Sequence, residues 1–91
     1  MPHRIALLGI LVEDLSSADA INAILHDYAP YIIGRMGIPH RERGVSIISV
    51  VLDAPAPTIA ALAGKIGMLP GVSSKTIMTK SGQEERKEDH V

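Results

Sequence analysis

The apolar residues of this chain fall into two successive halves, residues 3–38 and 45–79, and each half predicts a strand, a helix and a second strand. The full order is therefore β-α-β-β-α-β, the split arrangement that builds a four-stranded antiparallel sheet. Because each crossover connection is right-handed, both helices must lie on the same face of that sheet. We expect an α+β, ferredoxin-like sandwich in which residues 1–79 form a single domain.

Two of the four predicted strands, residues 3–12 and 45–52, are largely apolar on both of their alternating sides. Strands of this kind lie in the centre of a sheet and are covered on both faces. The strands at 31–38 and 72–79 contain glycines or polar residues, and therefore belong at the edges.

Capping residues and prolines place the helices between these strands. The first helix is expected to begin at Ser16, whose hydroxyl can cap it, and to end before Pro30. The second is expected to begin near Pro57 and to end at Pro70-Gly71. Each helix has one apolar stripe at helical spacing, namely Ile21, Ile24, Leu25 and Tyr28 in the first and Ile59, Leu62, Ala63 and Ile66 in the second.

With both helices on one face, the other face of the sheet would expose its apolar side chains. Such a patch, several hundred Å² in area, exceeds what a soluble monomer usually tolerates. Residues 80–91 are too polar to cover it, and we expect them to form a disordered tail. The sequence therefore predicts a homo-oligomer, a dimer or a tetramer, that associates through the sheet face or through a sheet edge.

The composition excludes several kinds of function. The chain has no cysteine, which excludes a disulfide, a thiolate-ligated metal or iron–sulfur centre and a cysteine nucleophile. A net charge of −1 argues against nucleic acid as a partner, and the predicted sheet offers only Tyr31 for stacking on bases. The apolar run at 5–12 is too short to span a membrane, and no targeting segment is recognisable, so we expect a cytoplasmic protein.

Several short runs resemble one known family. They are VED at 12–14, ILHDY at 24–28, IGRMGIP at 33–39, RERGVSII at 41–48, LAGKIG at 62–67 and LPGV at 69–72. Together they resemble the small regulators of the iron-only hydrogenase system. The resemblance implies an ACT-like domain, similar to the regulatory domain of the nickel-responsive repressor, and a homo-oligomer that regulates or senses a small ligand. It also suggests a regulatory or hydrogenase-maturation protein as a partner.

The strongest candidate for a ligand site is a group of basic residues around the connection between the two halves. It consists of Arg35, His40, Arg41 and Arg43, with Glu42 among them. Guanidinium groups bind carboxylates and phosphates bidentately, so the group predicts a site for a small anionic metabolite. The alternative is a solvated hairpin whose charges pair with Glu42 or with a neighbouring subunit.

Asp14 follows the first strand, in the loop where ACT-type domains bind their ligands. Its carboxylate can accept a hydrogen bond from a ligand amine, or it simply precedes a helix, where carboxylates are common. ACT domains that bind amino acids have a Pro-Gly pair in this loop. Residues 13–17 contain no glycine, which argues against an amino acid as the ligand.

Metal binding and catalysis have weaker support. His26 and His40 are the only histidines within predicted ordered segments, and imidazoles suit nickel, copper or zinc. Such a site would need two histidines from each of two subunits, and surface histidines are the alternative. The serines lie in no nucleophile motif, and residues 64–67 do not form a phosphate-binding loop, so we expect no enzyme. The rivals to a ligand sensor are a metal sensor and an assembly module that binds another protein by strand addition.

Overall fold

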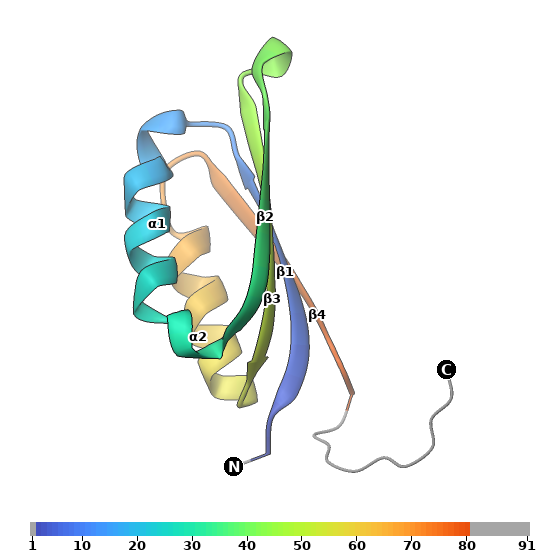
Figure 1. Ribbon diagram of the computed structural model, residues 1–91. Coiled ribbons are helices and arrows are strands. Elements are labelled where there is room, and N and C mark those ends of the chain that lie inside the picture. The colour runs from blue at the N-terminus through green and yellow to red at the C-terminus, as the bar shows by residue number, and fades with distance from the viewer. Residues whose placement is uncertain (1, 81–91) are drawn as a thin grey trace, which may run out of the picture.

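A computed structural model describes residues 2–80 of the chain (Figure 1). Within these residues the strands are β1 (Arg4–Val12), β2 (Ile32–His40), β3 (Val45–Ala54) and β4 (Val72–Met78). The α-helices are α1 (Ala18–Asp27) and α2 (Ala56–Gly67). Short 3₁₀ turns connect some of them: η1 (Leu15–Ser17), η2 (Ala29–Tyr31) and η3 (Arg41–Arg43).

The four strands form one sheet in the order β2-β3-β1-β4, and all neighbouring pairs are antiparallel. The two strands that are apolar on both sides, β1 and β3, occupy the centre, as their sequences predict. Both helices lie on the same face of the sheet (Figure 1). The predicted ferredoxin-like α+β fold is therefore confirmed.

The hydrophobic core lies between the sheet and the two helices. Along β1, Leu8 and Ile10 are at most 1% exposed, whereas Leu7 and Leu11 are 44% and 46% exposed. This alternation follows from the two-residue period of a strand and shows that only one face of the sheet is covered. Other members of the core, from β3 and the two helices, are Val50, Leu52, Ile21, Leu25, Ile59, Leu62 and Ile66.

The bounds of several elements differ from those expected: β3 continues two residues beyond 52, to Ala54, and the ends of α1 and β2 also differ. Helix α1 begins at Ala18 because Ser16 and Ser17 form the turn η1, which is capped by the Asp14 side chain. Strand β2 continues through Pro39 and His40, so the connection to β3 contains only residues 41–44. A proline, which has no backbone N–H to donate, is tolerated here because β2 is an edge strand and pairs on one side only.

The β2–β3 hairpin extends beyond the rest of the sheet. The last residue of β1, Val12, pairs with Ser46, and past this level only β2 and β3 continue. They end in the turn η3 at the far tip of the molecule (Figure 1). Gly44 closes the turn with φ of +65°, a left-handed conformation that favours glycine.

No helix within residues 2–80 is long and apolar enough to cross a lipid bilayer. Apart from Lys80, the predicted polar tail lies outside the described residues.

Candidate functional site

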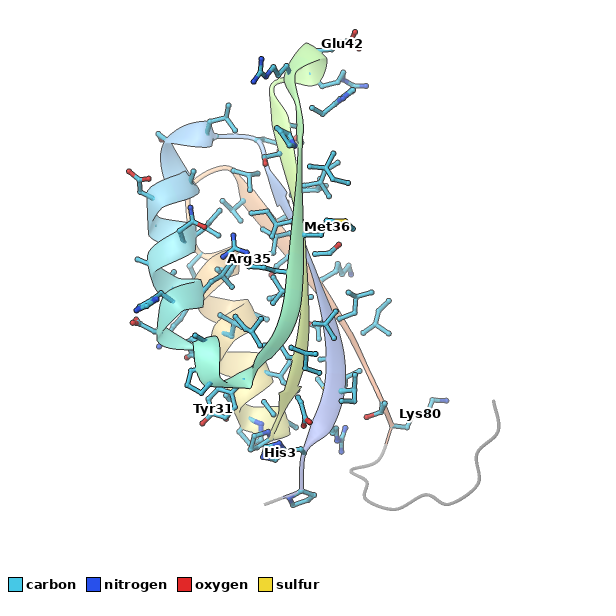
Figure 2. The ribbon with its side chains drawn as sticks, in the orientation of Figure 1. His3, Tyr31, Arg35, Met36, Glu42 and Lys80 are labelled. Atoms are coloured by element: carbon cyan, nitrogen blue, oxygen red, sulfur yellow. The ribbon has the colours of Figure 1, made fainter. Side chains whose placement is uncertain are left out.

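The sheet surface opposite the helices, called here the open face, is apolar. Its large side chains are Ile5, Leu7, Leu11, Met36, Ile38, Ile47, Val51 and Ile77. The strand register arranges them in rows: Leu7 lies between Val51 and Ile77, and Ile47 lies between Leu11 and Ile38. Figure 2 shows Met36 pointing away from the helices, into this face. The exposed surface that the sequence predicts is therefore present in the described chain.

A hollow lies in the open face beside Gly9 and reaches β4 at residues 73–75. Gly9 pairs with Ser49 on one side and Lys75 on the other. The volume of the hollow is about 240 Å³, and Leu11 and Ile47 form part of its lining. The hollow exists because Gly9 has no side chain, whereas any other residue at this position of β1 would place a side chain on the open face.

The structure separates the predicted group of basic residues. His40, Arg41 and Arg43 lie at or next to the tip of the β2–β3 hairpin and are exposed, as is Glu42. Arg35 lies five residues before His40 on β2, which places it roughly 17 Å away along the strand. Arg35 also faces the helix side of the sheet (Figure 2). The tip and Arg35 are thus two separate places.

Arg35 lies in a groove between α1 and β2. Its Nη2 donates a hydrogen bond to Oδ1 of Asn22 on α1, at 2.9 Å. The groove has a volume of about 390 Å³ and is lined by Asn22, Leu25, His26, Ala29, Ile32 and Arg35. It therefore brings together one residue predicted for anion binding, Arg35, and one predicted for metal binding, His26.

Asp14 is engaged by its own loop. Its Oδ1 accepts hydrogen bonds from the hydroxyl of Ser16 at 2.6 Å and from the backbone N–H of Ser16 at 3.0 Å. These two bonds, the hydroxyl first, hold the pKa of the Asp14 carboxyl below its usual value. The carboxylate therefore caps η1, which agrees with the simpler of the two interpretations of this residue.

The loop around Asp14 lies against the connection between α2 and β4. The backbone N–H of Glu13 donates to the carbonyl of Gly71 at 2.7 Å. The buried hydroxyl of Ser17 donates to the carbonyl of Pro70 at 2.8 Å. Gly71 has φ of +67°, and a Cβ placed there would overlap Cβ of Asp14 and lie 2.9 Å from its backbone nitrogen.

The two histidines proposed as metal ligands lie on different elements, His26 on α1 and His40 at the end of β2. Among residues 2–80, no three His, Asp or Glu side chains gather closely enough to hold a metal ion. His3 pairs instead with Asp53, with Nδ1 2.9 Å from Oδ1 and both side chains about half exposed.

Sequence reasoning did not identify Asn22 as part of a site. The sequence feature that could have identified Asn22 is its spacing from His26. The two residues are four positions apart and therefore share one side of α1, next to the apolar stripe. Which strand that side faces depends on how α1 packs, and no local pattern gives this information.

Comparisons with known proteins agree with the fold and the sequence runs. A sequence model of the TM1266-like family, described as "Iron-only hydrogenase system regulator, putative", matches residues 4–76. The solved structure of the uncharacterized protein TM1266 from Thermotoga maritima is 37% identical with a TM-score of 0.81, and the match covers 86% of this chain and 99% of that one. A formyltetrahydrofolate deformylase from Pseudomonas putida KT2440 is 19% identical with a TM-score of 0.55 over 81% of this chain and 28% of that one, a likeness of fold alone. No curated protein matches the chain. The resemblance inferred from the sequence is thereby confirmed, and the chain belongs to the TM1266-like family.

Proposed function

We propose that the protein is a non-enzymatic regulatory domain that assembles as a homo-oligomer through the open face and senses a small ligand. The description of its family as regulators supports the general role. The observation that carries the proposal is the open face, an apolar surface on the side of the sheet that the helices leave uncovered. The ACT-like character remains a prediction, as does a regulatory or hydrogenase-maturation protein as the regulated partner.

The area of the open face is sufficient to hold two copies together. Burying a half-exposed Leu or Ile side chain contributes about 1 kcal/mol. The eight open-face side chains on each of two copies therefore contribute on the order of 16 kcal/mol. Association costs about 4–15 kcal/mol in lost translational and rotational freedom, which leaves about 1–12 kcal/mol, and millimolar to micromolar affinities correspond to about 4–8 kcal/mol within this range.

The distribution of side chains on the open face supports a second copy as its occupant. Its apolar side chains extend across all four strands, from Met36 and Ile38 on β2 to Ile77 on β4, where Ser73 and Lys75 lie beside them. A continuous exposed apolar surface of this kind is typical of protein–protein interaction sites. The hollow at Gly9 offers space for a side chain that protrudes from the facing copy.

The regulatory mechanism that we propose is thermodynamic coupling. A ligand that binds one assembly state more tightly than another shifts the population toward that state, and by reciprocity assembly changes the affinity for the ligand. No bond-making chemistry by the protein is required.

Sedimentation equilibrium tests the assembly. The full chain should associate between about 1 µM and 1 mM, a range that spans dissociation free energies of roughly 4–8 kcal/mol. Leu7→Lys places a charge in the middle of the open face and should shift the protein to a monomer. Met68→Lys is the matched control: Met68 is 85% exposed at the end of α2, in the helix layer, and its substitution should leave association unchanged.

Two outcomes would contradict the assembly. A full-length protein that stays monomeric up to about 1 mM would leave the open face without this role. Association that survives Leu7→Lys would place the contact elsewhere, and the edge strand β2 is then the alternative.

Strand β2 supports a second candidate function, the recruitment of a protein segment by strand addition. It pairs with β3 on one side only, and every residue after Ile32 is exposed. Such an edge offers backbone donors and acceptors to an incoming strand. Gly37→Pro would remove one N–H from the edge and should weaken this mode of binding without affecting association through the open face.

A further inference from the structure

The groove between α1 and β2 combines a polar side with an apolar floor. Arg35 contributes a guanidinium and His26 an imidazole to the polar side, and Asn22 lies between the helix and the strand. Figure 2 shows Arg35 on the helix side of β2, facing α1. The volume of about 390 Å³ falls within the range of small-molecule sites in proteins.

Arg35 is oriented by Asn22 but retains most of its hydrogen-bonding capacity. The guanidinium has five N–H donors, and the bond from Nη2 to Asn22 Oδ1 uses one of them. Asn22 and His26 are one helical turn apart, so their side chains lie on the same side of α1. The groove therefore presents a fixed guanidinium and an imidazole on adjacent elements.

The remaining lining is apolar. Leu25 is buried in the core and forms part of the groove wall, together with Ala29 and Ile32. Ala29 is small, which keeps the groove open where α1 ends. A ligand that satisfies the whole lining has one anionic end and a short hydrocarbon chain or ring.

We propose that the α1–β2 groove binds a small organic monocarboxylate, with its carboxylate on Arg35 and His26 and its apolar part against Leu25, Ala29 and Ile32. The proposal rests on the proposed function, for which it supplies the site and chemical class of the sensed ligand. A carboxylate matches the planar fork of one guanidinium. Inorganic phosphate carries more charge than this single arginine offsets and makes no use of the apolar floor.

An NMR titration of the ¹⁵N-labelled full chain with butyrate tests the site. Saturable shifts are expected in the backbone amides of residues 22–36. Acetate should bind several-fold more weakly, because it lacks the two CH₂ groups of butyrate that the apolar floor would bury. Butylamine, which has the same chain with the opposite charge, should cause no saturable shift.

Variants assign the binding to Arg35. Arg35→Gln should weaken butyrate binding about tenfold or more, since a charge-assisted hydrogen bond is lost. Arg35→Lys, which keeps the charge but loses the fork, should be intermediate. Arg41→Gln makes the same substitution at the hairpin tip and should leave the affinity unchanged. Amides on β4, far from the groove, report whether each variant remains folded.

Three results would overturn the proposal: no saturation by butyrate, an affinity unchanged in Arg35→Gln, or tighter binding of inorganic phosphate at the same amides. The assembly is tested separately, by sedimentation equilibrium of the unsubstituted chain. An unsubstituted protein that associates but does not bind butyrate refutes the groove alone, and one that stays monomeric but binds butyrate refutes the assembly alone.

Discussion

Gly71 holds two loops together, and its substitution gives the sharpest test of the structure. Gly71 and Gly44 have nearly the same left-handed backbone, with φ of +67° and +65°. Their surroundings differ. A Cβ at Gly44 would meet no atom within 4 Å, whereas a Cβ at Gly71 would overlap the Asp14 side chain and backbone. Alanine at the two positions therefore separates the cost of the backbone conformation from the cost of the contact.

The expected costs are different in size. A left-handed conformation costs an L-residue roughly 1–2 kcal/mol, and the reduced entropy of the unfolded chain returns about 0.4–1 kcal/mol. Gly44→Ala should therefore lower the free energy of unfolding by about 1 kcal/mol. At Gly71 the same cost is joined by an overlap, typically about 1–3 kcal/mol, and by weakening of the 2.7 Å hydrogen bond from Glu13 N–H. Gly71→Ala should cost about 3 kcal/mol or more.

Urea denaturation followed by circular dichroism measures both variants. With an m value of about 1.5 kcal/mol/M, Gly71→Ala should lower the midpoint by about 2 M and Gly44→Ala by less than 1 M. All samples need the same protomer concentration, because association stabilises the folded state. Equal losses in the two variants would refute the contact between Gly71 and Asp14 and leave only the backbone effect.

Three other substitutions test separate parts of the same structure. Ser17→Ala removes the donor to the Pro70 carbonyl and should cost about 1–2 kcal/mol of unfolding free energy, measured by urea denaturation. Leu62→Ala leaves a cavity under a fully buried side chain and should cost about 3 kcal/mol in the same assay, and a loss below 1 kcal/mol would contradict its place in the core. Asp14→Ala removes the cap of η1 and should destabilise the protein at neutral pH. Because the pKa of Asp14 lies below its ordinary value of 3.8 in the folded state, this stabilisation is present above that value and is lost as the pH falls through the folded pKa. The difference in Tm between wild type and Asp14→Ala should therefore be largest near pH 7 and should shrink as the pH is lowered below 3.8.

The sequence predicted the sheet correctly because burial leaves a strong local pattern. In a strand that is covered by helices on one face and apolar on the other, polar and apolar residues do not alternate, because nearly all residues are apolar. Residues 5–12 show this pattern directly. The order of the sheet followed from which strands are apolar on both sides, and the right-handed crossover rule placed both helices on one face.

The group of basic residues was predicted less well because the bounds of β2 were wrong. The expected strand ended at Ile38, which assigned His40 to the polar connection between the two halves. In the structure the strand continues through His40, and an odd separation of five residues places Arg35 and His40 on opposite faces. The contact between Arg35 and Asn22 depends on helix packing, for which the sequence offers no pattern.

The two proposed surfaces lie on opposite faces of the sheet, and β2 is the element that they share. Arg35 faces the groove, and the next residue, Met36, faces the open face. β2 pairs only with β3 and is exposed along most of its length, so it is less constrained than the central strands. A carboxylate that fixes Arg35 against α1 would restrict the same backbone that presents Met36 to a second copy. Ligand binding and assembly would then be coupled through one strand, and the coupling would be lost in a protein whose β2 is held rigid.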